Sequence, residues 1–290
     1  SLPSKTSPSP EPFELVASLS LPYDVACAYA NGSVWAFGGG HIWRLDPETN
    51  SSAGVGTYAG VLVDPQVFAD PVTGAVYLVN NSVNIYRLSS SGSLVSVANL
   101  TSPAPEGSSF FAWNGSVYYA APGPRVYMVN STGGAVDLGF LDTPLAPSNA
   151  PGKPAVCVVN GTAYLYPSNS TFVYECPLPD GPVRYTARFF EPVVKSWFTG
   201  DRSAIWDPAG GLVWLVGGRA GCYVYFHSPA YRATGVVSSV VSATPVDVET
   251  GWFKAGHLYI ATGHGGVYVY EDRWYGEPWR VKWIGGGPWT

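Results

Sequence analysis

Asparagines in N-x-Ser/Thr acceptors are the residues whose spacing most directly predicts a chemical modification of this chain. Eight of the eleven asparagines stand in such acceptors, where the attached group would be an N-linked glycan. Asn-Gly turns followed by Ser or Thr create acceptors as a by-product, which would account for three of the eight. The remaining five indicate an exported glycoprotein, extracellular or on the cell surface. The predicted sites are Asn31, Asn50, Asn80, Asn99, Asn114, Asn130, Asn160 and Asn169.

Four cysteines offer a second kind of chemistry, because an even number permits two disulfides in an exported protein. Their spacing matches neither a zinc site nor a haem-attachment motif. The sequence leaves their pairing open, and single buried thiols are the alternative. The candidate disulfide residues are Cys27, Cys157, Cys176 and Cys222.

Polar and aromatic side chains in the predicted loops of one face are the next candidates. The richest stretch is VVKSWFTGDRSAIW, residues 193–206, which we interpret as an inserted loop. Long loops on a rigid scaffold often carry function, so Lys195, Trp197, Asp201 and Arg202 form a candidate binding face. An ion-paired surface loop is the alternative. The same face is expected to present Tyr23, Asp24, His41, Asp64, Glu106, Arg125, Lys153, Arg219, Asp247, Glu249 and His264.

The usual catalytic and ligand-binding motifs do not occur in the sequence. The histidines His41, His227, His257 and His264 have no metal-ligand spacing, and there is no G-x-S-x-G elbow, phosphate loop or calcium loop. We therefore predict no catalytic, cofactor-binding or metal-binding residue, and no cofactor. A pair of carboxylates that meet across a channel stays open as a site for acid–base chemistry.

Charge and composition exclude two classes of partner. The net charge of −5 argues against nucleic-acid binding, which normally needs a basic face. No run approaches the roughly 18 apolar residues of a membrane helix, so no transmembrane segment is predicted in this chain.

Residues 1–12 resemble a Ser/Pro-rich extended leader of a processed chain, and residues 13–290 are expected to form one domain. One Met, one Gln and 26 prolines hint at a thermophilic source.

The elements that position these residues repeat along the chain. Pairs of aromatic residues recur six times, with first members at Trp35, Tyr77, Tyr118, Tyr164, Trp214 and Tyr259. Each pair marks a strand–turn–strand unit, and six such units at the roughly regular spacing of these first members predict an array of four-stranded blades. A turn signal precedes each first member, three times as Asn-Gly, the strongest short-range signal for a hairpin. Further apolar runs supply the outer strands, for instance TYAGVLV (57–63), LVSVANL (94–100), VDLGFL (136–141) and VRYTARFF (183–190).

The predicted fold is therefore all-β, a six-bladed β-propeller of four-stranded antiparallel blades. In detail, NGSVWAFGGG and IWRLDPETN within residues 31–50 are similar to a kelch repeat, with paired glycines, a spaced aromatic and a terminal Asp-Pro turn. GGLVWLVGGRAGCYVY (210–225) is a second match, and ADPVTGAVYLV (69–79) resembles a quinoprotein blade. The resemblance implies either a surface interaction protein or a propeller enzyme.

Seven segments qualify as outer strands for six blades. FELVASLS (13–20) and RVKWIGGG (280–287) both match the outer position of the last blade. One of them could run along the rim. Alternatively, a terminal strand could pair with an exposed edge of another copy, and such head-to-tail links give a filament.

These observations favour a non-catalytic, exported cell-surface or extracellular structural or interaction glycoprotein that self-assembles through a terminal strand. The expected partners are other copies of itself or other surface proteins, with glycans as a further ligand. The alternative is a propeller enzyme that acts on carbohydrate (a hydrolase or lyase), or a quinone-dependent dehydrogenase. A carbohydrate-binding module is a third class, with Trp197, Trp274, Trp279 and Trp289 as candidate exposed aromatics.

Overall fold

The computed structural model describes most of the chain. The described residues are 13–141, 153–168, 170, 172–188, 202–217, 223–227, 229, 238–240 and 247–270. All regular structure within them is β-strand. Among these residues there is no helix that could span a membrane.

The first three sheets each contain four antiparallel strands in chain order. The first sheet consists of β2 (Ala26–Ala30), β3 (Ser33–Gly38), β4 (His41–Asp46) and β5 (Ser51–Thr57). The second consists of β6 (Gln66–Ala69), β7 (Val76–Asn80), β8 (Asn84–Leu88) and β9 (Leu94–Asn99). The third consists of β10 (Ser109–Trp113), β11 (Ser116–Ala121), β12 (Arg125–Val129) and β13 (Ala135–Asp137).

The remaining sheets vary this plan. The fourth has β15 (Ala155–Val159), β16 (Thr162–Tyr166), β17 (Phe172–Pro177) and β18 (Val183–Arg188), with β14 (Phe140–Leu141) added in parallel beside β18. The fifth has β19 (Arg202–Asp207), β20 (Leu212–Gly217), β21 (Tyr223–His227) and β22 (Ser238–Val240). The sixth has β23 (Val248–Lys254), β24 (His257–Thr262), β25 (Gly266–Tyr270) and, at its outer edge, β1 (Glu14–Ser18).

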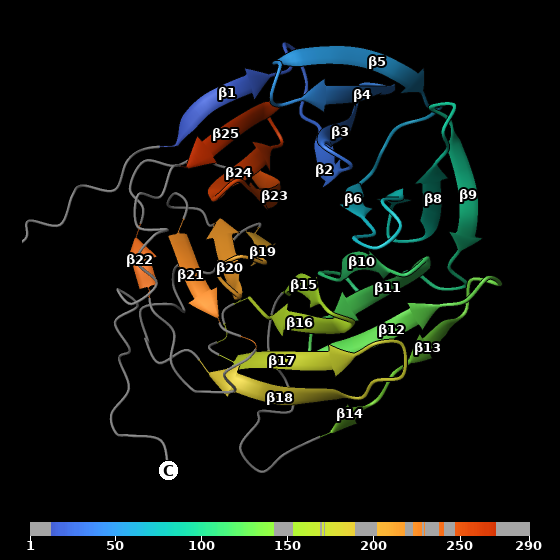
Figure 1. Ribbon diagram of the computed structural model, residues 1–290. Coiled ribbons are helices and arrows are strands. Elements are labelled where there is room, and N and C mark those ends of the chain that lie inside the picture. The colour runs from blue at the N-terminus through green and yellow to red at the C-terminus, as the bar shows by residue number, and fades with distance from the viewer. Residues whose placement is uncertain are drawn as a thin grey trace, which may run out of the picture.

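The sheets stand side by side in a ring, with the first strand of each next to the central axis (Figure 1). This arrangement confirms the predicted all-β propeller class. Five sheets have the predicted four antiparallel strands, whereas the fourth carries β14 as a fifth, parallel strand. The fourth sheet thus keeps the four predicted antiparallel strands, β15 to β18, and adds β14, because part of the segment that enters it lies along the edge of β18.

Two outer strands also differ from their predicted positions. The outer strand of the first sheet is Ser51–Thr57 and not residues 57–63, because the ladder pairs Asp46 with Ser51 and ends at Thr57. The predicted strand 136–141 is divided between β13 and β14. The residues 58–64 are consequently a loop, although their apolar sequence resembles a strand.

The turns between the first and second strands follow the predicted Asn-Gly signals. Asn31, Asn114 and Asn160 have φ values of 51°, 48° and 48°, and the glycines that follow them have 79°, 83° and 78°. β-Branched side chains resist this left-handed region, whereas Asn and Gly accept it. These turns fix the register of the inner hairpins in the first, third and fourth sheets.

The carboxylate of Asp70 ties the first turn of the second sheet to that of the third. Asp70 is 1% exposed, and within its own turn it accepts hydrogen bonds from the N–H of Val72 (2.9 Å) and the hydroxyl of Thr73 (2.8 Å). Across the sheet boundary it accepts from the N–H groups of Asn114 (3.2 Å) and Gly115 (2.6 Å). Burial raises the pKa of Asp70, but these hydrogen bonds outweigh burial and hold the pKa below its ordinary value. Asp70 therefore stays ionised and links two sheets.

The outer strands end against the turns of the next sheet, and glycines permit the approach. The N–H of Thr101, just beyond β9, donates to the carbonyl of Gly133 in the β12–β13 turn at 3.1 Å. A Cβ on Gly133 would overlap the carbonyl oxygen of Asn99. A Cβ on Gly92, in the β8–β9 turn, would likewise overlap the carbonyl oxygen of Val55 in β5. These joints connect the outer strands of the first three sheets.

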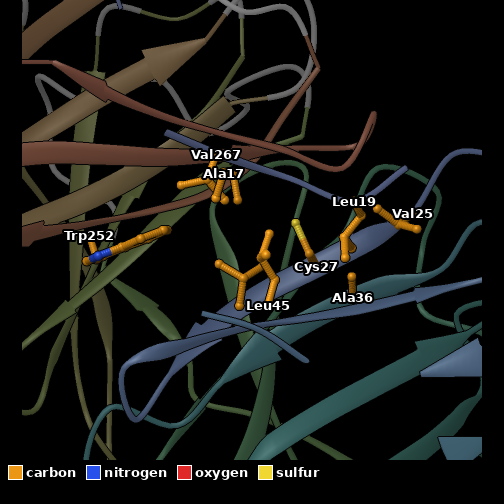
Figure 2. Packing of buried hydrophobic residues seen from close by; sticks show 10 residues of the cluster. Ala17, Leu19, Val25, Cys27, Ala36, Leu45, Trp252 and Val267 are labelled. Carbon is orange, nitrogen blue, oxygen red and sulfur yellow. The ribbon is translucent and has the colours of Figure 1, made fainter. Parts of the chain in front are cut away.

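The sixth sheet packs against the first across a buried seam, part of which Figure 2 shows. Trp252 and Val267 of the sixth sheet share one hydrophobic cluster with Cys27 of the first. Ala17 of β1 is 0% exposed in the same cluster. Trp252 also stacks on Tyr29 of the first sheet, with ring centroids 4.0 Å apart. Apolar burial therefore holds the two ends of the described chain together.

The N-terminal strand closes the ring within its own chain. In the β1–β25 ladder, Glu14 pairs with Val269 and Ser18 pairs with Gly266. The edge of β25, which would otherwise expose unpaired N–H and C=O groups, is thereby filled. The prediction that residues 13–20 are donated to another copy is wrong for this reason. The competing segment, residues 280–287, lies outside the described residues.

Candidate binding site at the channel mouth

The ring surrounds a cavity with a volume of about 1170 Å³. Its walls come from the inner strands and from the loops that lead into them. Aromatic rings such as Phe68, Phe110 and Trp252 line it together with polar groups such as Gln66 and Ser203. A cavity with this size and mixed lining could hold a ligand or the projecting side chains of a partner.

The two ends of the cavity differ in chemistry. The turns between first and second strands form one end. The other end is formed by the turns between second and third strands and by the loops that enter each sheet. Four carboxylates line the cavity at this second end, which we call the acidic mouth: Asp24, Asp64, Asp247 and Glu249. Lys153, from the segment before β15, also lines it.

His264 stands between two carboxylates of the acidic mouth. Its Nδ1 lies 3.1 Å from Oδ1 of Asp24, and its Nε2 lies 4.0 Å from Oδ2 of Asp247. His264 belongs to the β24–β25 turn, whereas the two Asp residues precede β2 and β23. The structure thus brings together three of the residues that the sequence predicted on one face. An Asp–His pair can act in proton transfer, but the side chains of His264 and Asp24 are 57% and 79% exposed, so water surrounds them.

An apolar loop projects beside the acidic mouth. We call residues 58–64, between β5 and β6, the β5–β6 loop. Val61 and Val63 in this loop are 82% and 52% exposed. Leu62 between them packs into the core with Tyr58. Sequence reasoning missed this feature because it assigned the apolar run 57–63 to the outer strand of the first sheet, which is in fact Ser51–Thr57.

Six of the seven described glycosylation asparagines are exposed. Three occupy the first turns of their sheets, at the end of the cavity opposite the acidic mouth. The other three lie in third turns or at the end of an outer strand, and therefore on the rim. In that order, the six are Asn31, Asn114, Asn160, Asn50, Asn130 and Asn99.

Asn80 differs from the other described acceptors. It is half-buried at the end of β7, and its Oδ1 accepts a hydrogen bond from the N–H of Val63 at 2.7 Å. This asparagine therefore has a structural task in holding the β5–β6 loop. Asn169 lies outside the described residues.

Three of the candidate disulfide residues are free thiols. Cys27, Cys157 and Cys176 are buried, and no disulfide joins any two of them in the structure. Burial raises the pKa of the Cys157 and Cys176 thiols to about 12. Burial, with the nearby Glu249 and Asp247 carboxylates, also raises the pKa of Cys27. These thiols match the alternative of single buried side chains. Cys222 lies outside the described residues.

The predicted binding face in residues 193–206 is placed only in part. Lys195, Trp197 and Asp201 lie outside the described residues. Arg202 begins β19, so the end of this stretch is an inner strand and not a loop. The reason is apolar packing, because Ile205 is 3% exposed in a cluster shared with the sixth sheet. Within the described part of the chain, no group of three or more His, Cys, Asp or Glu side chains is placed to hold a metal ion.

A ring of radial, mostly four-stranded antiparallel sheets around a central cavity defines a β-propeller. No protein family and no curated protein sequence matches the chain. A protein of unknown function from Bacteroides thetaiotaomicron has a similar structure, with a TM-score of 0.58 at 14% identity over 89% of this chain and 75% of that chain.

Two further solved structures are similar. Virginiamycin B lyase from Staphylococcus aureus gives a TM-score of 0.56 at 12% identity, over 90% of this chain and 88% of the lyase. A chain of a nidogen/laminin complex gives 0.50 at 15% identity, over 82% of this chain and 85% of that chain. At such identities the likeness shows the propeller fold alone. The kelch-like or quinoprotein-like subclass stays a prediction.

Proposed function

We propose that this protein is an exported, non-catalytic interaction propeller. In this proposal, N-linked glycans cover the rim and one end of the cavity, and the acidic mouth is left free for a partner. The observation that carries the proposal is the distribution of acceptors. Five exposed asparagines lie in first or third turns, at the end opposite the acidic mouth, and exposed Asn99 lies on the outer strand β9, away from the cavity; the half-buried Asn80 lies on the acidic side.

Two further observations support an interaction role. Propellers present rigid loops on a fixed scaffold, which suits recognition without chemistry. A chain of similar fold occurs in the nidogen/laminin complex, an assembly of two different proteins. Other surface proteins are therefore the proposed partners, with glycans as a further ligand. Because β1 closes its own ring, self-assembly through residues 13–20 is not part of the proposal.

Peptide mapping by mass spectrometry of material from the natural source tests the glycan proposal. We expect sugar on the exposed acceptors and a bare Asn80, whose side chain is held by Val63. The matched variants are N114Q and N80Q, expressed in the same host. N114Q should lose the mass of one glycan, and N80Q should lose none. A bare polypeptide in native material would remove the support for export.

A second candidate function is an enzyme that uses the Asp24–His264 pair. The pair has hydrogen-bond geometry at the mouth of a large cavity, and a similar fold occurs in a lyase. In this candidate, Asp24 orients the imidazole of His264, which accepts a proton from a bound substrate. The high exposure of both side chains is the reason for ranking this function second.

Activity screens on polysaccharides separate the two candidates. A turnover that disappears in H264A and persists in H41A, which removes another exposed histidine, would favour the enzyme. The interaction proposal expects no turnover in the wild type. The tryptophans proposed for a carbohydrate-binding module, Trp197, Trp274, Trp279 and Trp289, lie outside the described residues.

A further inference from the structure

The β5–β6 loop holds its two outward valines in a fixed position. The N–H of Val63 donates to Oδ1 of Asn80 at 2.7 Å, and the carbonyl of Val63 accepts from the N–H of Asn81 at 2.8 Å. These bonds attach the end of the loop to the β7–β8 turn of the second sheet. The exposure of Val61 and Val63 is therefore set by the fold.

The other end of the loop is attached to the first sheet. The N–H of Tyr58 donates to the carbonyl of Gly40 in the β3–β4 turn at 3.0 Å. Tyr58 and Leu62 pack against the core cluster shared by the first two sheets. With Leu62 inside, its neighbours Val61 and Val63 are left outside. A loop fixed at both ends loses little conformational entropy when a partner binds.

Carboxylates line the mouth beside this apolar projection, and the one described lysine that lines the same mouth is Lys153, before β15. Asp64 is the last residue of the loop, is exposed and lines the cavity. Asp24, Asp247 and Glu249 line the same mouth. The described segments that form this side of the mouth contain no Lys or Arg; they are residues 19–26, 38–41, 57–66, 80–84, 247–250 and 262–266. A partner cation would therefore meet no competing Lys or Arg from these segments.

We propose that Val61, Val63 and Asp64 form a docking surface for a polypeptide partner that presents an apolar side chain next to Lys or Arg. The inference rests on the proposed interaction function and adds the chemistry of the partner. The valines would lose exposed apolar area on binding, which supplies affinity. Asp64 and the acidic mouth would select the basic residue, which supplies specificity. Asn80 and Asn81, in the β7–β8 turn beside the loop, hold this surface in place through their hydrogen bonds to the backbone of Val63.

The test uses the full chain and synthetic peptides, with fluorescence anisotropy as the readout. The probe is a labelled peptide of sequence GSLKLKGS, and the matched peptides replace both Leu by Ser or both Lys by Glu. We expect saturable binding of the first peptide below about 1 mM and at least tenfold weaker binding of both others. V61D should weaken binding of the first peptide at least tenfold. D64K should weaken it and should improve binding of the Glu peptide.

V95D is the control, because Val95 is 47% exposed on the outer strand β9, away from the loop. It should leave peptide binding unchanged, and circular dichroism should show all three variants folded. Equal binding of the Lys and Glu peptides, no saturable binding, or an equal loss in V95D would overturn the proposal. Self-association of the wild type that V61D abolishes would also overturn it, because the occupant would then be a second copy. Since the test needs no glycans, a failure of the export proposal would leave its result intact.

Discussion

Gly133 in the third sheet lies against the backbone carbonyl of Asn99 in the second, at a joint where a Cβ has no room. Gly133 also has a φ of 83°. Replacing it by Ala should destabilise the fold by about 3 kcal/mol, because the strain of positive φ adds to a backbone overlap.

Gly115→Ala is the matched control for this prediction. Gly115 has the same φ of 83°, but a Cβ there meets nothing within 4 Å. Its cost should be only the conformational part, about 1–2 kcal/mol. Urea unfolding of the two variants measures the difference. Equal losses would show that the joint between the outer strands does not constrain the fold.

Asp70→Asn should lower the free energy of unfolding by about 2–4 kcal/mol. The substitution removes the charge and places an amide against donors, including the N–H of Gly115 that now donates at 2.6 Å. Asp207→Asn is the matched control, because Asp207 opens the equivalent turn of the fifth sheet but its buried Oδ2 accepts no hydrogen bond. Its cost should stay below about 1 kcal/mol.

The pH dependence of the Asp70 effect follows from its lowered pKa. The unfolded carboxyl titrates near 3.9, so it binds a proton at a higher pH than the folded one does. The stabilisation by Asp70 is therefore complete above about pH 5 and is lost as the pH falls through the folded pKa. The gap between wild type and D70N in urea titrations should shrink below pH 4. A gap that stays constant down to pH 2.5 would contradict the assignment of the charge to these bonds.

Much of the fold could be predicted because its signals are local. The Asn-Gly turns at Asn31, Asn114 and Asn160 appear where the sequence places them, since few residues tolerate their φ values. Ring closure could not be predicted in the same way. Residues 13–20 and 280–287 carry the same outer-strand pattern, and only the long-range pairing of β1 with β25 distinguishes them.

The candidate site was less predictable than the fold. Sequence reasoning put Asp24 and His264 on one face, but their contact joins residues 240 positions apart and depends on closure of the ring. The exposed Val61 has the local pattern of a buried strand residue. Its exposure follows from the ladder that ends at Thr57, which is a tertiary property.

The buried thiols should make the protein less stable at alkaline pH. The pKa of Cys157 and Cys176 is about 12 in the fold, whereas an unfolded thiol titrates near 8.5. Because the folded pKa is raised, the contribution of each thiol to the free energy of unfolding is complete below about pH 8.5 and is lost as the pH rises above that value. Between pH 7 and 9.5, the ionisation of each thiol in the unfolded chain should lower the free energy of unfolding by about 1.4 kcal/mol.

Urea unfolding of C157A under reducing conditions measures this thiol effect. The variant should lose about 1.4 kcal/mol less than the wild type between pH 7 and 9.5. Val159→Ala is the control, because Val159 is buried in the same cluster but does not titrate. It should lower stability equally at both pH values. An unchanged slope in C157A would mean that the thiol ionises in the folded protein.

The last prediction concerns the strand that closes the ring. Ala17 of β1 is 0% exposed in the seam between the sixth and first sheets, whereas Leu15 of the same strand is 53% exposed. A17D places an unpaired charge in an apolar seam and should cost several kcal/mol, while L15D should change stability by less than about 1 kcal/mol.

Deleting residues 1–20 should have a similar effect to A17D, because it leaves the edge of β25 unpaired and opens the seam. Thermal unfolding and light scattering measure the two consequences, a lower Tm and association through the exposed edge. This expectation reverses the idea that the segment links molecules, since losing the strand should increase association and not reduce it. If the deleted chain keeps its Tm and stays monomeric, β1 does not hold the ring closed, and another segment must fill that edge.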